Sequence, residues 1–150
     1  MIDSTLENAI NEIGLICIET KGTSMNPLLY SGKNKVLIVK VDRKIKKHDI
    51  VLYRRDSGIY VLHRVMKVLD NSYVLCGDNH CVLEYGITNR HILGIAEGYY
   101  KGEKYIEFSK SFRYKVYKFF WCSSLKFRAF LIKLRAVPGK IKRIFKKKKP

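Results

Sequence analysis

The first hundred or so residues alternate short apolar, β-branched runs with turn residues. Runs rich in Val, Ile, Leu and Tyr that are bounded by Gly, Asp, Asn and Ser predict β-strands. They lie at residues 15–19, 35–41, 50–55, 59–69, 73–76, 91–100 and 104–108. Turn residues at 56–58 and 101–103 predict two hairpins, and residues 77–86 are predicted to be a loop. The pattern therefore predicts a mainly β fold of short antiparallel strands.

Two further segments follow the helical period instead. Leu6, Ile10 and Ile13 repeat at helical spacing behind a capping serine, which predicts a short helix over residues 5–13. After residue 111, apolar and basic side chains separate onto two sides of a helical wheel, which predicts an amphipathic C-terminal helix. The apolar side holds Phe112, Val116, Phe119, Phe127, Phe130 and Leu134, and the basic side Lys115, Lys118, Lys126 and Lys133. We expect this helix to end at the Val-Pro-Gly of residues 137–139.

Charge divides the chain at the same place. Of a formal net charge of +17, residues 1–109 carry 15 Lys or Arg against 13 Asp or Glu, whereas residues 110–150 carry 15 basic residues and no acidic one. We therefore expect a β domain over 1–109 and a basic, aromatic-rich helical tail over 110–150. A polybasic amphipathic helix favours peripheral contact with an anionic membrane. An acidic peptide and nucleic acid remain alternative partners, each less favoured than the membrane.

Cysteine use and the N-terminal segment bear on the compartment. The cysteines Cys17, Cys76, Cys81 and Cys122 are sparse and form no CxxC pair, which predicts reduced thiols. The polar, acidic stretch at 1–14 has no signal-peptide pattern, and no run of about 18 uncharged apolar residues predicts a spanning helix. We expect a cytoplasmic protein that can meet the inner membrane surface through its tail.

Candidate chemistry begins in KGTSMNPLLYSG, residues 21–32, where Ser24 stands in a turn. A serine hydroxyl needs a general base and oxyanion donors before it becomes a nucleophile. Strand alternation places His63 on the apolar face that carries Val61 and Val65. Burial there is expected to lower the histidine pKa and keep the imidazole neutral, as a general base requires. A purely structural core histidine fits the same spacing.

Asp78, in CGDNH, is the candidate third member, because a carboxylate on the far imidazole nitrogen fixes the tautomer. A turn aspartate fits the same Gly-Asp-Asn loop. The neighbouring Cys76, His80 and Cys81 suggest metal ligands, but their spacing does not match a zinc pattern. We expect no metal and no cofactor.

The motifs in order resemble those of type I signal peptidases and the related self-cleaving repressor peptidases. GTSMNPLL at 22–29 resembles the GxSMxPxL box, DIV at 49–51 the following strand, and CGDNH at 76–80 the GDN box. VLHRV at 61–65 resembles the second catalytic segment, with histidine where many members carry lysine. The likeness extends over about residues 14–108, to a closing strand that contains Gly94.

This resemblance implies a role for each matching residue. Ser24 would be the nucleophile, His63 the general base and then the acid, and Asp78 the residue that orients His63. The Ser24 N–H would contribute to the oxyanion hole, and Met25 and Pro27 would lie against the substrate. Met25 would also anchor the turn in the core. Lys67, on the same strand face as His63, is an alternative base.

The chain departs from the family pattern at two positions in the motifs. Gly22 stands where many members have an additional serine donor, and His48 stands in place of the glycine before Asp49, at a turn where we expect glycine to be easy to replace. The resemblance implies a serine endopeptidase that cleaves a peptide, leader or pro-segment through an acyl-enzyme on Ser24. The alternative is a non-catalytic peptide-binding module that its basic tail tethers to anionic lipid or nucleic acid. The oligomeric state is left open.

Overall fold

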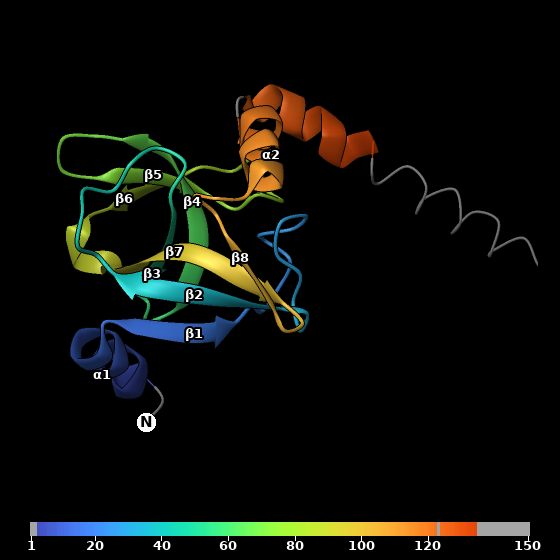
Figure 1. Cartoon of the computed structure of the whole chain (residues 1–150). Helices are drawn as coiled ribbons and strands as arrows, with labels where there is room; N and C mark the ends of the chain where they lie inside the picture. The colour runs from blue at the N-terminus through green and yellow to red at the C-terminus, as the bar shows by residue number, and fades with distance from the viewer. Residues whose placement is uncertain (1–2, 123, 135–150) are drawn as a thin grey trace, which may run out of the picture.

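A computed structural model describes residues 3–122 and 124–134, and its described part is mainly β (Figure 1). Helix α1 (Asp3–Ile13) precedes the sheet, and helix α2 (Phe112–Cys122) follows it. The described strands are β1 (Leu15–Glu19), β2 (Asn34–Lys40), β3 (Ile50–Arg54), β4 (Tyr60–Val68), β5 (Tyr73–Cys76), β6 (Glu84–Ile87), β7 (Ile92–Lys101) and β8 (Lys104–Glu107). The predicted fold class is confirmed.

All strand pairs are antiparallel, and the long strand β7 organises them. The order is β1-β2-β7-β3-β4-β5-β6, with β8 also paired to β7. One edge of β7 pairs with β2, while the other pairs with β3 near the start of β7 and with β8 near its end. Figure 1 shows the sheet strongly curled, with β1 as one of its terminal strands.

Strand alternation divides the interior into two apolar clusters. In β3, Ile50 and Leu52 belong to the first cluster, together with side chains of α1, β2 and the loop after β1. Val51 and Tyr53 point the other way into the second cluster, which β4, β5 and β7 complete. Because successive strand residues face opposite sides, this register also decides which face of β4 each of its residues uses.

The helix predicted over residues 5–13 and the seven predicted strands are confirmed. The predicted loop over 77–86 is wrong at its end, because β6 begins at Glu84 and pairs with β5. Its sequence, EYGI, contains two residues of low strand propensity, so this strand depends on its neighbours. The expectation that glycine is easy to replace at position 48 is also wrong: His48 has φ 76°, in the left-handed region that favours glycine.

The C-terminal segment forms two helices rather than the one predicted. After α2 a second helix spans residues 125–134. Ser124 caps it: its hydroxyl accepts a hydrogen bond from the Phe127 N–H at 3.4 Å, and its carbonyl accepts one from Arg128 at 2.9 Å. The predicted break at 137–139 lies outside the described residues. Within the described ranges, no helix combines the length and the apolarity needed to cross a bilayer.

Candidate active site

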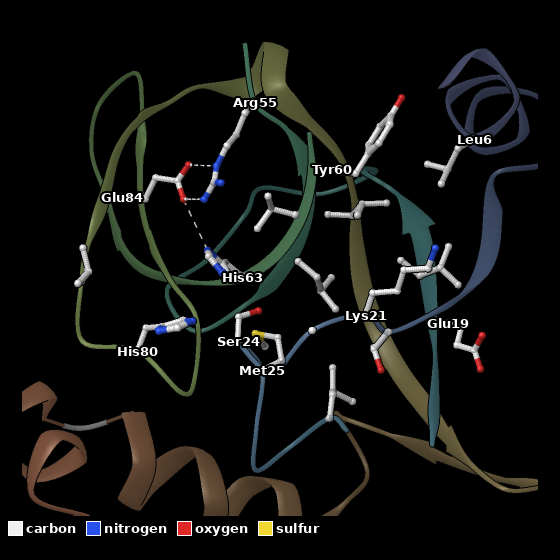
Figure 2. A pocket seen from close by; sticks show the side chains of 18 of the residues that line it. Leu6, Glu19, Lys21, Ser24, Met25, Arg55, Tyr60, His63, His80 and Glu84 are labelled. Carbon is white, nitrogen blue, oxygen red and sulfur yellow. Dashed lines mark hydrogen bonds and ion pairs between the residues drawn. The ribbon is translucent and has the colours of Figure 1, made fainter. Parts of the chain in front are cut away.

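A cavity of about 820 Å³ opens between α1, the end of β1, strand β4 and the segment that leads into β6. Ser24, His63, His80 and Glu84 line it together with a largely apolar wall (Figure 2). Met25, which the resemblance places against the substrate, also lines this cavity. The predicted substrate contact of Pro27 is not supported, because Pro27 is not among the lining residues.

The turn that carries Ser24 is anchored by its neighbour. Met25 is 5% exposed and belongs to the first apolar cluster. Its carbonyl accepts hydrogen bonds from the N–H groups of Leu28 and Leu29 at 3.1 and 3.0 Å. The expectation that Met25 anchors the turn is therefore confirmed. As a result, Ser24 stands at the cavity with its side chain partly exposed.

His63 occupies the centre of β4, opposite Val51 of β3. Val61 and Val65 pack in the second cluster, so the predicted apolar face is confirmed. The His63 residue is 8% exposed, and this burial lowers its pKa to about 4. The imidazole is therefore neutral at pH 7 and able to accept a proton.

The tautomer of His63 follows from Tyr53 and Glu84. The Tyr53 hydroxyl donates to Glu84 Oε2 at 2.7 Å and lies 3.1 Å from His63 Nδ1. A phenol has one proton, and burial raises the Tyr53 pKa so that this proton stays. Because the single Tyr53 proton forms the hydrogen bond to Glu84, the Tyr53 oxygen is left to accept a hydrogen bond from the Nδ1–H of His63. The lone pair on Nε2 is left free, as a general base requires.

Arg55 fixes the carboxylate behind this hydrogen-bonded chain. Its guanidinium donates to both oxygens of Glu84, each at 2.7 Å. Although burial opposes the effect, the hydrogen bonds from Arg55 and Tyr53 lower the pKa of Glu84. The carboxylate is thus charged, and its Oε2 lies 3.7 Å from His63 Nδ1, as the dashed line in Figure 2 marks. A proton gained by His63 would be stabilised at that distance.

Gly77 brings the serine segment and the histidine together. A Cβ at Gly77 would lie 2.7 Å from the Ser24 carbonyl oxygen and 3.1 Å from His63 Nε2. The Asn79 N–H donates to the same carbonyl at 2.7 Å. Only a residue without a side chain allows the GDN loop to lie this close to both groups. The free nitrogen of His63 consequently lies beside the Ser24 backbone.

No hydrogen bond joins the Ser24 hydroxyl to His63 among the described residues. Catalytic hydrogen bonds of this kind often tighten only when a substrate is bound. The Ser24 N–H likewise has no acceptor within the part of the chain that the structure describes. It is therefore available as an oxyanion donor, as the resemblance implies.

The predicted role of Asp78 requires a correction. Its carboxylate oxygens accept hydrogen bonds from Arg64 Nε and Nη2 at 2.7 and 2.6 Å, and the Tyr117 hydroxyl donates to it at 2.9 Å. Asp78 and Arg64 are both 0% exposed. Arg64 follows His63 in β4 and therefore points to the opposite face of the strand. Asp78 lies on that other face, so Tyr53 and Glu84 orient His63 instead.

The alternative base Lys67 is also in the wrong place. The β4–β5 register shifts between Val65 and Lys67, which interrupts the simple alternation from which a shared face was predicted. Lys67 is exposed and is not among the residues that line the cavity. His63 is thus the base candidate that the structure brings to Ser24.

The four cysteines Cys17, Cys76, Cys81 and Cys122 are free thiols, in agreement with the prediction. The Cys76 thiol donates weakly to the carbonyls of Gly77 and His80, both at 3.3 Å. Among residues 3–122 and 124–134 there is no group of three or more His, Cys, Asp or Glu side chains arranged to hold a metal ion.

No protein-family model matches the chain, and no curated protein is significantly similar to it in sequence. Its function has to be inferred from the residues and their geometry.

Proposed function

We propose that the protein is a serine endopeptidase with Ser24 as nucleophile and His63 as general base. One observation carries this proposal: buried His63 lies with Nδ1 3.1 Å from the Tyr53 hydroxyl, which donates to Glu84, and with Nε2 close to the Ser24 segment. From this geometry we infer that Tyr53 accepts the Nδ1–H and that Nε2 is the free base. A histidine that served packing alone would not need a tautomer fixed by two further side chains. The resemblance in sequence order supports the same assignment.

The reaction follows from the positions of these groups. The Ser24 hydroxyl oxygen attacks the substrate carbonyl carbon while its proton passes to His63 Nε2. The Ser24 N–H stabilises the oxyanion, and the charged imidazole is stabilised by Glu84 through Tyr53. His63 then gives the proton to the leaving amine as the C–N bond breaks, which leaves an ester on Ser24. A water molecule, deprotonated by His63, hydrolyses this ester and restores the hydroxyl.

The cavity favours an extended peptide with apolar side chains. Leu6, Ile18 and Leu62 line its wall. Strand β1 pairs with β2 only, so among the described strands its outer edge is free, and this edge reaches the cavity at Glu19. Main-chain pairing along such an edge is a common way to hold an extended peptide. The cavity and the strand edge therefore favour an extended peptide as substrate, and the resemblance in sequence favours a leader or pro-segment.

The alternative, a non-catalytic peptide-binding module, is supported by the missing hydrogen bond between Ser24 and His63. The two functions differ in whether Ser24 reacts. Labelling with a fluorophosphonate, which phosphonylates activated serines with loss of fluoride, separates them without knowledge of the substrate.

We expect the full chain to gain one probe adduct, mapped to Ser24 by peptide mass spectrometry. The variant Ser24→Ala should gain none. Ser31→Ala is the matched control, because Ser31 is an exposed serine of the same segment and does not line the cavity; it should label at the wild-type rate. Absence of an adduct in the folded wild-type chain would reject the peptidase and favour the binding module.

A further inference from the structure

A row of large apolar side chains lies exposed along the two C-terminal helices. In α2, Phe112 and Phe119 are 77% and 71% exposed. Helical spacing places these residues on one side of α2, and three others share one side of the helix at 125–134. We call the set the aromatic stripe: Phe112, Val116, Phe119, Phe120, Phe127, Phe130 and Leu134.

The opposite sides of both helices are already buried. Tyr114 and Trp121 of α2 are 7% and 8% exposed, and Arg128 of the next helix is 0% exposed. The Arg64 Nη1 donates to the Tyr114 hydroxyl at 2.8 Å, and Trp121 Nε1 donates to the Asp78 carbonyl at 2.8 Å. Each helix therefore packs on the domain by its inner side and presents the aromatic stripe outward.

Basic side chains border the aromatic stripe. By helical geometry, Arg113 and Lys115 fall on either side of it in α2, and Lys126 and Lys133 lie beside it in the second helix. All four are exposed. Residues 110–150 contain no acidic residue to offset them. The outer surface thus has an apolar centre with positively charged margins.

We infer that the aromatic stripe is a docking surface for an anionic lipid bilayer. Apolar side chains can enter the boundary between headgroups and acyl chains, while Lys and Arg reach the lipid phosphates. Nucleic acid would use the basic residues, but it offers no apolar phase for Val116 and Leu134. A contiguous row of exposed large apolar side chains marks a surface that binds a partner or a membrane. Charge complementarity selects an anionic one.

Docking would hold the cavity close to the lipid headgroups. Arg128 Nη1 donates to the carbonyls of Gly77 and His80 at 3.2 and 3.4 Å. The inner side of the second helix therefore contacts the loop that also contacts Ser24, and Figure 2 shows helical ribbon below this loop and His80. The position of the cavity near the helices follows from the Arg128 hydrogen bonds, so it does not depend on whether Ser24 is a nucleophile.

Flotation of the full chain with vesicles tests the surface. We expect binding to phosphatidylcholine vesicles that contain about one third phosphatidylglycerol, and much weaker binding to pure phosphatidylcholine or at high salt. The double variant Phe112→Ser/Phe119→Ser should bind at least about tenfold more weakly. The matched control Ile13→Ser/Tyr85→Ser removes apolar residues that are 69% and 65% exposed elsewhere, and should bind as the wild type does.

Several outcomes would overturn the inference. They are equal binding by the stripe variant and the wild type, equal binding to neutral and anionic vesicles, tighter binding to DNA than to vesicles, and a stable dimer that the stripe variant abolishes. If the double variant fails to fold, Phe119→Trp serves instead. Its emission should shift to the blue on anionic vesicles and be quenched by brominated lipid, and absence of quenching would contradict docking.

Discussion

Two carboxylates lie on opposite faces of β4, and their surroundings give them different roles. Glu84 has a side chain that is 23% exposed, lines the cavity and contacts His63 through Tyr53. Asp78 is 0% exposed and forms a bidentate ion pair with Arg64. The division arises because His63 and Arg64 are consecutive in a strand and face opposite sides. The face with Glu84 carries the proposed active site, and the face with Asp78 joins the sheet to the C-terminal helices.

The Asp78 side gives the largest expected effect. Replacing Asp78 by Asn keeps the shape but leaves a fully buried Arg64 guanidinium without its counter-charge. We expect a loss of about 3–5 kcal/mol in the free energy of unfolding, measured by urea denaturation. The matched control is Asp56→Asn, because the Asp56 side chain is 80% exposed in its contacts with Arg90 and His91. The control should lose less than about 1 kcal/mol. An equal decrease in the free energy of unfolding for the two variants would contradict a structural role for the buried Asp78 face.

The next largest effect is expected at Gly77, which precedes Asp78 and lies against both Ser24 and His63. In Gly77→Ala the new methyl group would lie 2.7 Å from the Ser24 carbonyl oxygen and 3.1 Å from His63 Nε2. Because the Ser24 contact is with backbone, the loop must move away. We expect the fluorophosphonate labelling rate at Ser24 to fall about 100-fold, with the fold retained by circular dichroism. An unchanged rate would show that the close approach of the loop is not needed.

The Glu84 side should affect rate more than stability. In Tyr53→Phe, His63 loses the acceptor for its Nδ1–H, and its tautomer is no longer fixed. We expect labelling of Ser24 to slow about tenfold or more, read from the time course of intact mass. Tyr73→Phe is the control, because the Tyr73 hydroxyl donates to Asn89 outside the cavity. A Tyr53→Phe rate equal to that of the control would remove Tyr53 from the site.

The smallest expected effect is a shift along the pH axis. Burial lowers the pKa of His63 to about 4, so the base stays neutral well below the usual histidine value of about 6.5. Labelling of Ser24 should decline with a midpoint near pH 4 rather than near 6.5. A decline centred near pH 6.5 in the folded protein would contradict the burial of His63.

His48 separates this activity effect from stability. Burial, reinforced by Arg64, lowers the pKa of His48 to about 4 as well. Since both folded-state values lie below the unfolded value, the unfolded chain takes up protons first. Stability is therefore lost as pH falls from about 6.5 towards 4, by about 2 kcal/mol per histidine at pH 5. His48→Gln should reduce this loss in urea titrations and leave the pH midpoint of labelling unchanged, because His48 does not line the cavity.

Local pattern was sufficient to predict seven of the eight described strands, the face of His63 and the anchoring by Met25. Period-2 alternation and the position of a hairpin turn depend on neighbouring residues only. The same register could have placed Tyr53 on the face of His63, since Val51 is opposite His63 and Tyr53 is two residues further along β3. Glu84 could not be found in this way. Its strand has weak propensity and is positioned by pairing with β5.

The packing of the C-terminal helices could not be predicted from local pattern. The helical wheel separated the apolar and basic sides of this segment, but it predicted no side that packs on the β domain. In the structure Tyr114, Tyr117 and Trp121 pack inward. Their polar atoms meet the buried Arg64–Asp78 pair through the Tyr114 and Tyr117 hydroxyls and the Trp121 Nε1. Which side of the helix packs inward thus depends on a charge pair between residues distant from the helix in sequence. The periodicity of the helix sequence contains no information about that pair.

The central claim is that His63, and no other group, removes the proton from Ser24. The most direct measurement compares the fluorophosphonate labelling rate constants of Ser24 in His63→Ala and Lys67→Ala, the two bases that the sequence offers on β4. We predict a fall of at least about 100-fold for His63→Ala and a change below about twofold for Lys67→Ala. Near wild-type labelling in His63→Ala, or a large loss in Lys67→Ala, would contradict the account.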